Sequence, residues 1–100
     1  MHLSHERNVS LVALAKTRFI EEHAGRLFCE ACGFDFCKKY GERGIDFIEV
    51  HHKKFISVRT KNEPTRIEDL VMLCSNCHSI LHRYQPWLSM EELEQLISRF

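Results

Sequence analysis

Apolar residues recur at helical spacing near the start of the chain. Across residues 8–24, NVSLVALAKTRFIEEHA, they form one broad stripe: Val12, Ala15, Phe19 and Ala24, with Leu11 and Ile20 beside it. This spacing places them on one face of a helix. Gly25 follows at once, and glycine is typical of the position just after a helix. The pattern predicts an amphipathic helix over residues 8–24.

Three shorter segments predict strands. Residues 26–29, RLFC, and residues 70–73, LVML, are short and mostly apolar, and residues 44–52, GIDFIEVHH, are rich in β-branched and aromatic side chains. After the first of these segments, residues 35–41 have the sequence DFCKKYG. With Asp35 at its start and Gly41 at its end, this segment predicts a single capped helical turn.

The segment after the longest predicted strand has a different character. Residues 53–69 are polar, contain Pro64 and show no regular spacing of apolar positions. We expect a long loop here, and a loop of this length in a compact domain is usually functional or disordered.

Two more helices are predicted near the end. Residues 74–85, CSNCHSILHRYQ, begin as a cysteine turn and continue as a helix that Pro86 ends. In residues 89–100, Ser89 and Glu92 have the spacing of a capping box. The apolar stripe of this last helix is expected to face the core and consists of Leu93, Leu96, Ile97 and Phe100.

Composition places the chain among small globular domains. Its 100 residues are 44% hydrophobic and 28% charged, which allows a thin apolar core of the kind that often relies on a metal or a disulfide. Fourteen basic and fourteen acidic residues cancel, with only a modest basic excess in the middle of the chain. We expect one domain, with residues 1–25 as an N-terminal helix, 26–85 as the core and 86–100 as a C-terminal helix, either complete or as a fragment of a longer chain.

The sequence also indicates the cellular compartment in which the protein is expected. No apolar stretch approaches the roughly 18–20 residues of a membrane span, and the start, MHLSHERN, has no apolar signal-peptide core. We therefore expect a cytoplasmic protein, in which thiols stay reduced and paired cysteines bind metal more often than they form disulfides.

Four of the five cysteines form two C-x2-C pairs, Cys29 with Cys32 and Cys74 with Cys77. Each turn aims two thiolates at one point, and two turns complete a tetrahedral four-sulfur site that suits Zn²⁺. Four thiolates leave no position for water, so this zinc would be structural and would join the first turn to the start of the following helix. The alternative is four small buried cysteines without a metal. Cys37 lies outside both pairs and is expected to be a small core residue.

Four of the seven histidines have informative positions. His78 and His82 are spaced i, i+4 and share one helix face, whereas His51 and His52 end a predicted strand and point to opposite faces. If His51 meets the helical pair, three imidazoles hold a metal with open positions, as in catalytic sites. His52 would stay off the metal and could take a proton from water, because imidazole titrates near neutral pH. The alternative is four hydrogen-bonded histidines without a metal. The remaining histidines are expected at the surface: His2, His5 and His23.

Taken together, CEACGF, YGERGIDFIEVHHKKFIS and IEDLVMLCSNCHSILHR resemble the HNH endonucleases, in a cysteine-bearing branch similar to the 5-methylcytosine-specific restriction protein A. The resemblance covers residues 26–83. It joins a histidine doublet, an acidic residue before leucine, a C-x2-C-H turn and H-x3-H, in that order. It implies a small α+β structure with a ββα-metal (His-Me finger) core and a four-cysteine structural zinc, flanked by N-terminal and C-terminal helices.

The resemblance also implies roles for individual residues. His51, His78 and His82 would hold a catalytic divalent ion, which could be Mg²⁺, Mn²⁺, Co²⁺, Ni²⁺ or Zn²⁺. His52 would be the general base. Asp69 takes the place of the asparagine that holds the loop in this family. Its carboxylate could accept backbone N–H groups of the loop, or it could accept the second ring proton of His52.

The implied reaction is hydrolysis of DNA phosphodiester bonds to 5′-phosphate and 3′-hydroxyl ends, in restriction or another form of DNA processing. DNA would be bound mainly through its backbone, and a homodimer or a separate targeting domain is a further expected partner. The candidate phosphate contacts are Lys53, Lys54, Arg59, Lys61, Arg66 and Arg83.

Two other functions compete with nuclease activity. The first is a catalytically inactive, zinc-stabilised DNA-binding module, favoured by Asp69 and by Phe55, which stands where the family often has proline. The second is a zinc-dependent scaffold for another protein. The complete set of histidines opposes the second function, because a scaffold needs no metal with open positions.

Overall fold

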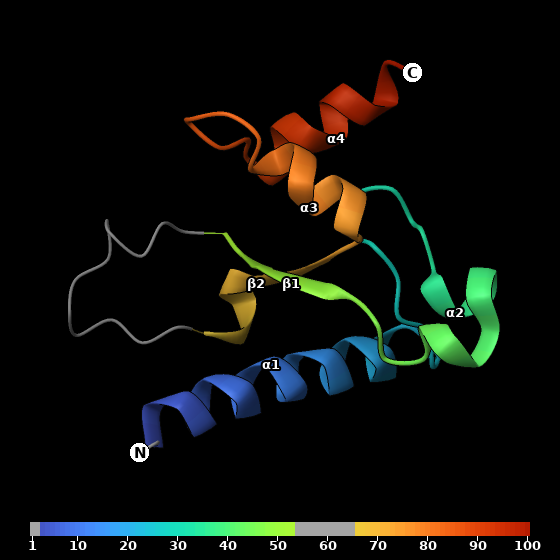
Figure 1. The fold of residues 1–100 in the computed structure, drawn as a ribbon, viewed down its shortest axis with the longest axis vertical. Helices are drawn as coiled ribbons and strands as arrows, with labels where there is room; N and C mark the ends of the chain where they lie inside the picture. Colours follow the sequence, from blue (N-terminus) through green and yellow to red (C-terminus); the bar gives the residue numbers. More distant parts are fainter. Residues whose placement is uncertain (1–2, 54–65) are drawn as a thin grey trace.

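A two-stranded sheet between helices forms the centre of the molecule. The computed structural model describes residues 3–53 and 66–100, with the side chains of residues 11–53 and 66–100. The sheet lies between α1 on one side and α3, with α4 beyond it, on the other (Figure 1). This is the small α+β fold that the resemblance implied. The elements are α1 (Leu3–Glu22), α2 (Phe36–Tyr40), the 3₁₀ turn η1 (Gly41–Gly44), β1 (Glu49–His52), the 3₁₀ turn η3 (Ile67–Asp69), β2 (Leu70–Leu73), α3 (Ser75–Leu81) and α4 (Met90–Ser98).

The register of the sheet decides what each of its faces carries. β1 and β2 are antiparallel, with His51 opposite Val71 and His52 opposite Leu70. Residues opposite each other on neighbouring strands share a face. Val71 packs in the cluster on the α3 side and Leu70 in the cluster on the α1 side. The two adjacent histidines therefore point to opposite faces, His51 toward α3 and His52 toward α1.

β2 is buried on both faces, and this explains its unbroken apolar sequence. All four of its residues are buried. The even-numbered ones pack with Ala15 and Phe19 of α1, and the odd-numbered ones pack with Leu81 of α3 and Leu93 of α4. β2 is therefore the element that joins the two halves of the core.

The first helix is longer than predicted and ends two residues earlier. Its stripe faces the core as the spacing predicted, with Ala15 and Phe19 buried. Ala24 is exposed and lies beyond the helix. It has a φ of 59° and Gly25 a φ of 87°, so the chain turns through two left-handed residues rather than one.

Of the three predicted strands, one is absent and one is shorter than expected. Residues 26–29 are not a strand, because the chain enters the first cysteine turn there and only Glu30 pairs its backbone N–H with β2, at Met72. Of residues 44–52, only Glu49–His52 form a strand. Gly44 ends η1, where a Cβ would overlap the backbone of Phe36, and residues 45–48 form a turn and an irregular segment before the strand.

The predicted caps of two short helices are confirmed. Asp35 caps α2 by accepting the Lys38 backbone N–H, and Gly41 ends it, as predicted. The Ser89–Glu92 capping box opens α4. However, α3 ends at Leu81, several residues before Pro86, because the chain folds back and Leu88 donates its backbone N–H to Leu81.

The prediction that the apolar stripe of α4 faces the core is only partly confirmed. Leu93 is buried, and Leu96 and Ile97 are half-buried, but Phe100 is 99% exposed because the helix ends at Ser98. Within the described residues, no helix is both long and apolar enough to cross a membrane.

Candidate active site

The four paired cysteines converge on one point. Their ligand atoms all lie within 4.8 Å of one another, and the sulfurs of Cys32 and Cys74 are 3.8 Å apart. A tetrahedron with Zn–S bonds of about 2.3 Å has edges of about 3.8 Å. The donor set and its spacing therefore suit a zinc ion.

Backbone groups support this cysteine cluster. The N–H of Cys32 donates to the sulfur of Cys29, and the N–H of Cys77 donates to the sulfur of Cys74, both at 3.4 Å. Burial raises the pKa of the Cys29 thiol, but hydrogen bonds from the backbone of Cys74, Cys32 and Ala31 outweigh it, so that the pKa is lowered.

The sulfurs cannot all ionise on their own. Burial, followed by the charge of Cys29 and hydrogen bonds within the cluster, raises the pKa of the Cys77 thiol far above its usual value. Burial likewise raises the pKa of the Cys32 thiol. Four thiolates at this spacing require a cation, and a coordinating thiol is deprotonated when a metal binds.

The cysteine cluster is part of the apolar core. Cys29, Cys74 and Cys77 are buried in one group with Leu81 and Leu93. Cys74 is also the N-cap of α3. A zinc ion bound here would join the first cysteine turn to the start of α3, as predicted, and would support a thin core.

Three histidines meet a short distance along α3. His51 comes from β1, and His78 and His82 lie one helical turn apart, since the N–H of His82 donates to the carbonyl of His78. Their ring centroids are 5.3, 5.0 and 4.8 Å apart. Each offers a nitrogen within 4.8 Å of the others, and Nε2 of His82 lies 3.2 Å from Nδ1 of His51. We call this group the histidine triangle.

Two rings of the histidine triangle, those of His51 and His82, favour the neutral form. Burial, and then the neighbouring His78, His82 and His52, lower the pKa of His51 to about 4. Burial and then His78 also lower the pKa of His82. Imidazole binds metal in its neutral form, so the lone pairs of these rings are available at neutral pH.

Glu49 is a site residue that the sequence interpretation missed. Its Oε1 lies 2.7 Å from Nδ1 of His78, and this hydrogen bond is the main cause that lowers the pKa of the Glu49 carboxyl. A carboxylate that holds one ring nitrogen fixes the ring and leaves the other nitrogen to face a metal. The alternation of strand residues could have found it, because Glu49 precedes His51 by two positions and shares its face.

Trp87 is the second residue that was missed. Its ring centroid lies 3.8 Å from that of His82 and 6.0 Å from that of His51. It belongs to the segment that returns after α3, and no periodic pattern in the sequence indicates where such a segment will lie.

The other predicted catalytic residues lie outside the histidine triangle. His52 is half-buried at the last position of β1. Asp69 lies at the entrance to β2, where its carboxylate accepts the Arg66 N–H at 3.1 Å and its carbonyl accepts the Lys53 N–H at 2.8 Å. Asp69 thus contacts the residues at both ends of the segment between β1 and η3. This position suits the first of the two roles considered for it, in which it holds the loop.

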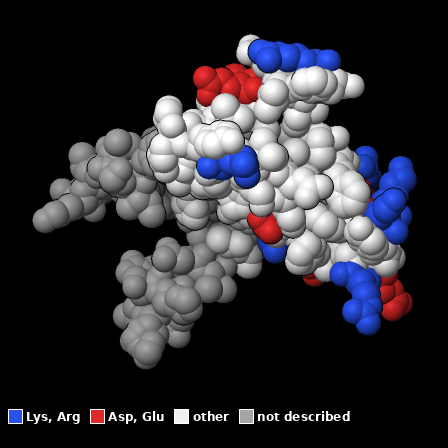
Figure 2. All heavy atoms as spheres, turned by 45° about the horizontal axis from the view of Figure 1, so that its top comes forward, with Lys and Arg blue, Asp and Glu red and all other residues white. Residues whose placement is uncertain are grey.

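The predicted phosphate contacts are only partly described. Lys53, Arg66 and Arg83 are exposed, and Arg83 stacks over Tyr84 with 5.0 Å between the guanidinium carbon and the ring centroid. Lys54, Arg59 and Lys61 lie outside the described residues, as does Phe55. Figure 2 shows Lys and Arg side chains in separate groups over the visible face rather than in one patch.

Two residues without an assigned role differ from expectation. Cys37 is exposed and is not a core residue, because α2 is a short surface turn without buried side chains. His23 is half-buried rather than at the surface, since its ring stacks on Phe19 at 3.9 Å. The placement of His2 and the side chain of His5 lie outside the described residues.

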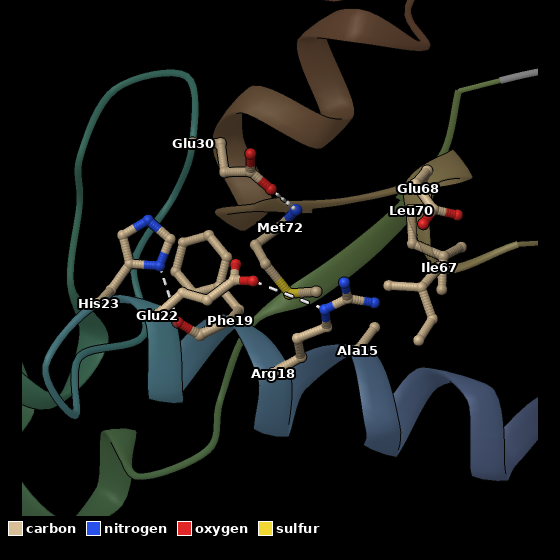
Figure 3. A pocket seen from close by; sticks show the side chains of 10 residues that line it. All are labelled: Ala15, Arg18, Phe19, Glu22, His23, Glu30, Ile67, Glu68, Leu70 and Met72. Atoms are coloured by element: carbon tan, nitrogen blue, oxygen red, sulfur yellow. Dashed lines mark hydrogen bonds and ion pairs between the residues drawn. The ribbon is translucent and has the colours of Figure 1, made fainter.

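A pocket of about 290 Å³ lies on the α1 side of the sheet (Figure 3). Neither the cysteine cluster nor the histidine triangle lines it. There, Glu30 accepts the Met72 N–H at 2.8 Å, while Arg18 pairs with Glu22 on α1. Of these two contacts, only the one from Glu30 involves β2, where its carboxylate accepts the backbone N–H of Met72.

Comparison with known proteins adds the family. No curated protein and no solved structure matches the chain. The family model described as HNH endonuclease matches residues 29–84, a segment that begins at the first cysteine ligand and includes the sheet, the histidine triangle and α3. Because this match covers more than half of the 100 residues, the chain belongs to the HNH endonuclease family.

Proposed function

We propose that this protein is a metal-dependent DNA endonuclease. The observation that carries the proposal is the histidine triangle, where three imidazoles converge from β1 and α3 while the adjacent His52 stays outside. Three ligands leave positions open for substrate and water, as catalytic sites require. Family membership supports a nuclease in general, and the geometry suggests how this chain would act.

In this proposal His51, His78 and His82 hold a divalent ion, and Glu49 orients His78. When bound, the ion supplies Lewis acidity at a scissile phosphate. The imidazole set suits Zn²⁺, Ni²⁺ and Co²⁺, and Mg²⁺ and Mn²⁺ are the further candidates.

His52 is the proposed general base. It takes a proton from a water molecule whose oxygen forms a bond to phosphorus, while the bond from phosphorus to the 3′ oxygen breaks. The leaving oxygen gains a proton, so the products are a 5′-phosphate and a 3′-hydroxyl. Asp69 keeps His52 in place by closing the loop that follows β1, through its contacts with Arg66 and Lys53.

DNA is held mainly through its phosphates. Exposed Lys53 and Arg66 flank the ends of the loop beside His52, and Arg83 follows His82 directly. Such contacts position the backbone and carry no sequence information. The proposed set also includes Lys54, Arg59 and Lys61.

The cysteine cluster supports a more specific assignment. We propose that the chain is a single domain of the cysteine-bearing branch similar to the 5-methylcytosine-specific restriction protein A, with a role in restriction or DNA processing. A second copy of the chain, or a separate targeting domain, would supply the second cut or the choice of sequence.

An inactive DNA-binding module is the second candidate, favoured by Asp69 in the place of asparagine. A cleavage assay separates the two. Supercoiled plasmid is incubated with zinc-loaded protein and Mg²⁺, Mn²⁺, Co²⁺, Ni²⁺ or Zn²⁺, and the product ends are labelled. Nicked DNA that kinase labels at its 5′ ends only after phosphatase treatment supports the endonuclease. Salt-sensitive binding without nicking in any metal supports the module.

A further inference from the structure

The two helical histidines of the triangle are supported in different ways. His78 has the hydrogen bond from Nδ1 to Glu49. His82 uses Nε2 toward His51, and no hydrogen bond holds its Nδ1 among residues 11–53 and 66–100, whose side chains the structure describes. Moreover, His82 follows the last residue of α3, with φ −90° and ψ 0°. A ring at a helix end without a hydrogen bond on its second nitrogen needs another support to keep one orientation.

Trp87 lies against this ring. The centroids are 3.8 Å apart at an interplanar angle of 69°. Aromatic rings in edge-to-face pairs are usually about 4.5–7 Å apart, so the contact is direct. A direct ring contact of this kind limits the orientations that the ring of His82 can adopt.

The position of Trp87 is itself held by the core. Leu88 donates its backbone N–H to Leu81 at 3.2 Å, which returns the segment to the end of α3. Trp87 and Leu88 pack against the cluster that contains Leu93 of α4. The indole is thus packed against the apolar core and lies beside two rings of the histidine triangle.

We propose that Trp87 is a positioning residue of the histidine metal site. It fixes the ring of His82 so that Nε2 points to His51, as Glu49 fixes His78, and it links α4 to the site. This inference rests on the metal site of the proposed function.

The test measures metal binding by the full, zinc-loaded chain. Ni²⁺ is titrated into wild type, Trp87→Leu and Trp87→Phe, with binding followed by calorimetry and structural zinc by elemental analysis. Leucine keeps the apolar packing but has no ring, whereas phenylalanine keeps a ring. Tyr84→Ala removes an exposed ring from the same segment and is the matched control. The fluorescence of Trp87, the only tryptophan, provides a second readout in wild type.

We expect Trp87→Leu to weaken Ni²⁺ binding about 10- to 100-fold, the range found for residues that support metal-binding histidines. Trp87→Phe should recover most of the affinity, Tyr84→Ala should bind like wild type, and saturating Ni²⁺ should quench the tryptophan fluorescence. Wild-type affinity in Trp87→Leu, or equal losses in the Leu and Phe variants, would overturn the proposal. Loss of structural zinc from Trp87→Leu would also contradict it, because the indole would then support the core instead. Failure of the proposed metal site is a distinct result: His78→Ala would then bind Ni²⁺ as wild type does.

Discussion

Oε1 of Glu49 lies 2.7 Å from Nδ1 of His78, so that a carboxylate of β1 holds a histidine of α3. The contact joins the two elements that form the histidine triangle and gives His78 one defined orientation. It also distinguishes a prepared metal site from three histidines that merely lie close together.

Glu49→Ala should therefore weaken binding of a divalent ion by about 10- to 100-fold, the usual effect of removing such a partner. Glu49→Gln should lose less, because its amide oxygen can still accept the hydrogen bond. Calorimetric titration of the zinc-loaded protein with Ni²⁺ measures both. Glu94→Ala removes an exposed carboxylate of α4 and is the control. Equal affinity in all three variants would remove Glu49 from the site.

Cys74→Ser should release the structural zinc and lower the free energy of unfolding strongly, since the site joins the first cysteine turn to α3. Cys37→Ser is the matched control, because Cys37 is exposed and lies outside the cysteine cluster. Elemental analysis should find about one zinc per chain in wild type and in Cys37→Ser when no other metal is added. A full zinc content in Cys74→Ser would show that the cluster does not hold the ion.

Leu93→Ala should destabilise the protein by about 2–5 kcal/mol, as expected for a buried leucine. Leu93 is 1% exposed and packs beside the cysteine cluster, whereas Leu14 is 55% exposed. Leu14→Ala should therefore change stability little. Urea unfolding of the zinc-loaded variants gives both values. A similar loss in the two variants would mean that α4 does not contribute to the core as described.

Asp69→Asn separates the two roles considered for Asp69. If the side chain holds the loop by accepting the Arg66 N–H, the asparagine oxygen can do the same, and the rate of plasmid nicking should stay within about threefold of wild type. Asp69→Ala removes the acceptor and should slow nicking about fivefold, in line with the roughly 1 kcal/mol that such caps contribute. A much slower rate in Asp69→Asn would instead assign the carboxylate to the orientation of His52.

The sequence predicted those parts of the fold in which local pattern and tertiary packing agree. The stripe of Ala15 and Phe19, the segment Leu70–Leu73 and the Ser89 cap all appear as expected. Residues 44–47 share the composition of a strand but form turns, because Gly44 lies against the backbone of Phe36 and Asp46 has a φ of 62°. The pattern of hydrophobicity does not contain this information.

The site shows the same division. The spacing of His78 and His82, the doublet at His51 and the family resemblance together indicated the three histidines that meet. Glu49 could have been predicted from the alternation of side chains along β1, because it lies two positions before His51 and on the same face. Trp87 could not be predicted, since its place depends on how residues after α3 fold back on Leu81 and pack with α4.

Metal binding and proton transfer are assigned to different histidines, and the nicking rate of His52→Ala tests this separation most directly. With supercoiled plasmid and the most active ion, wild type should nick, and His52→Ala should be about 10²–10⁴-fold slower while it still binds DNA and Ni²⁺. His78→Ala, measured beside it, should lose Ni²⁺ binding as well. A His52→Ala protein that nicks at the wild-type rate would contradict the account.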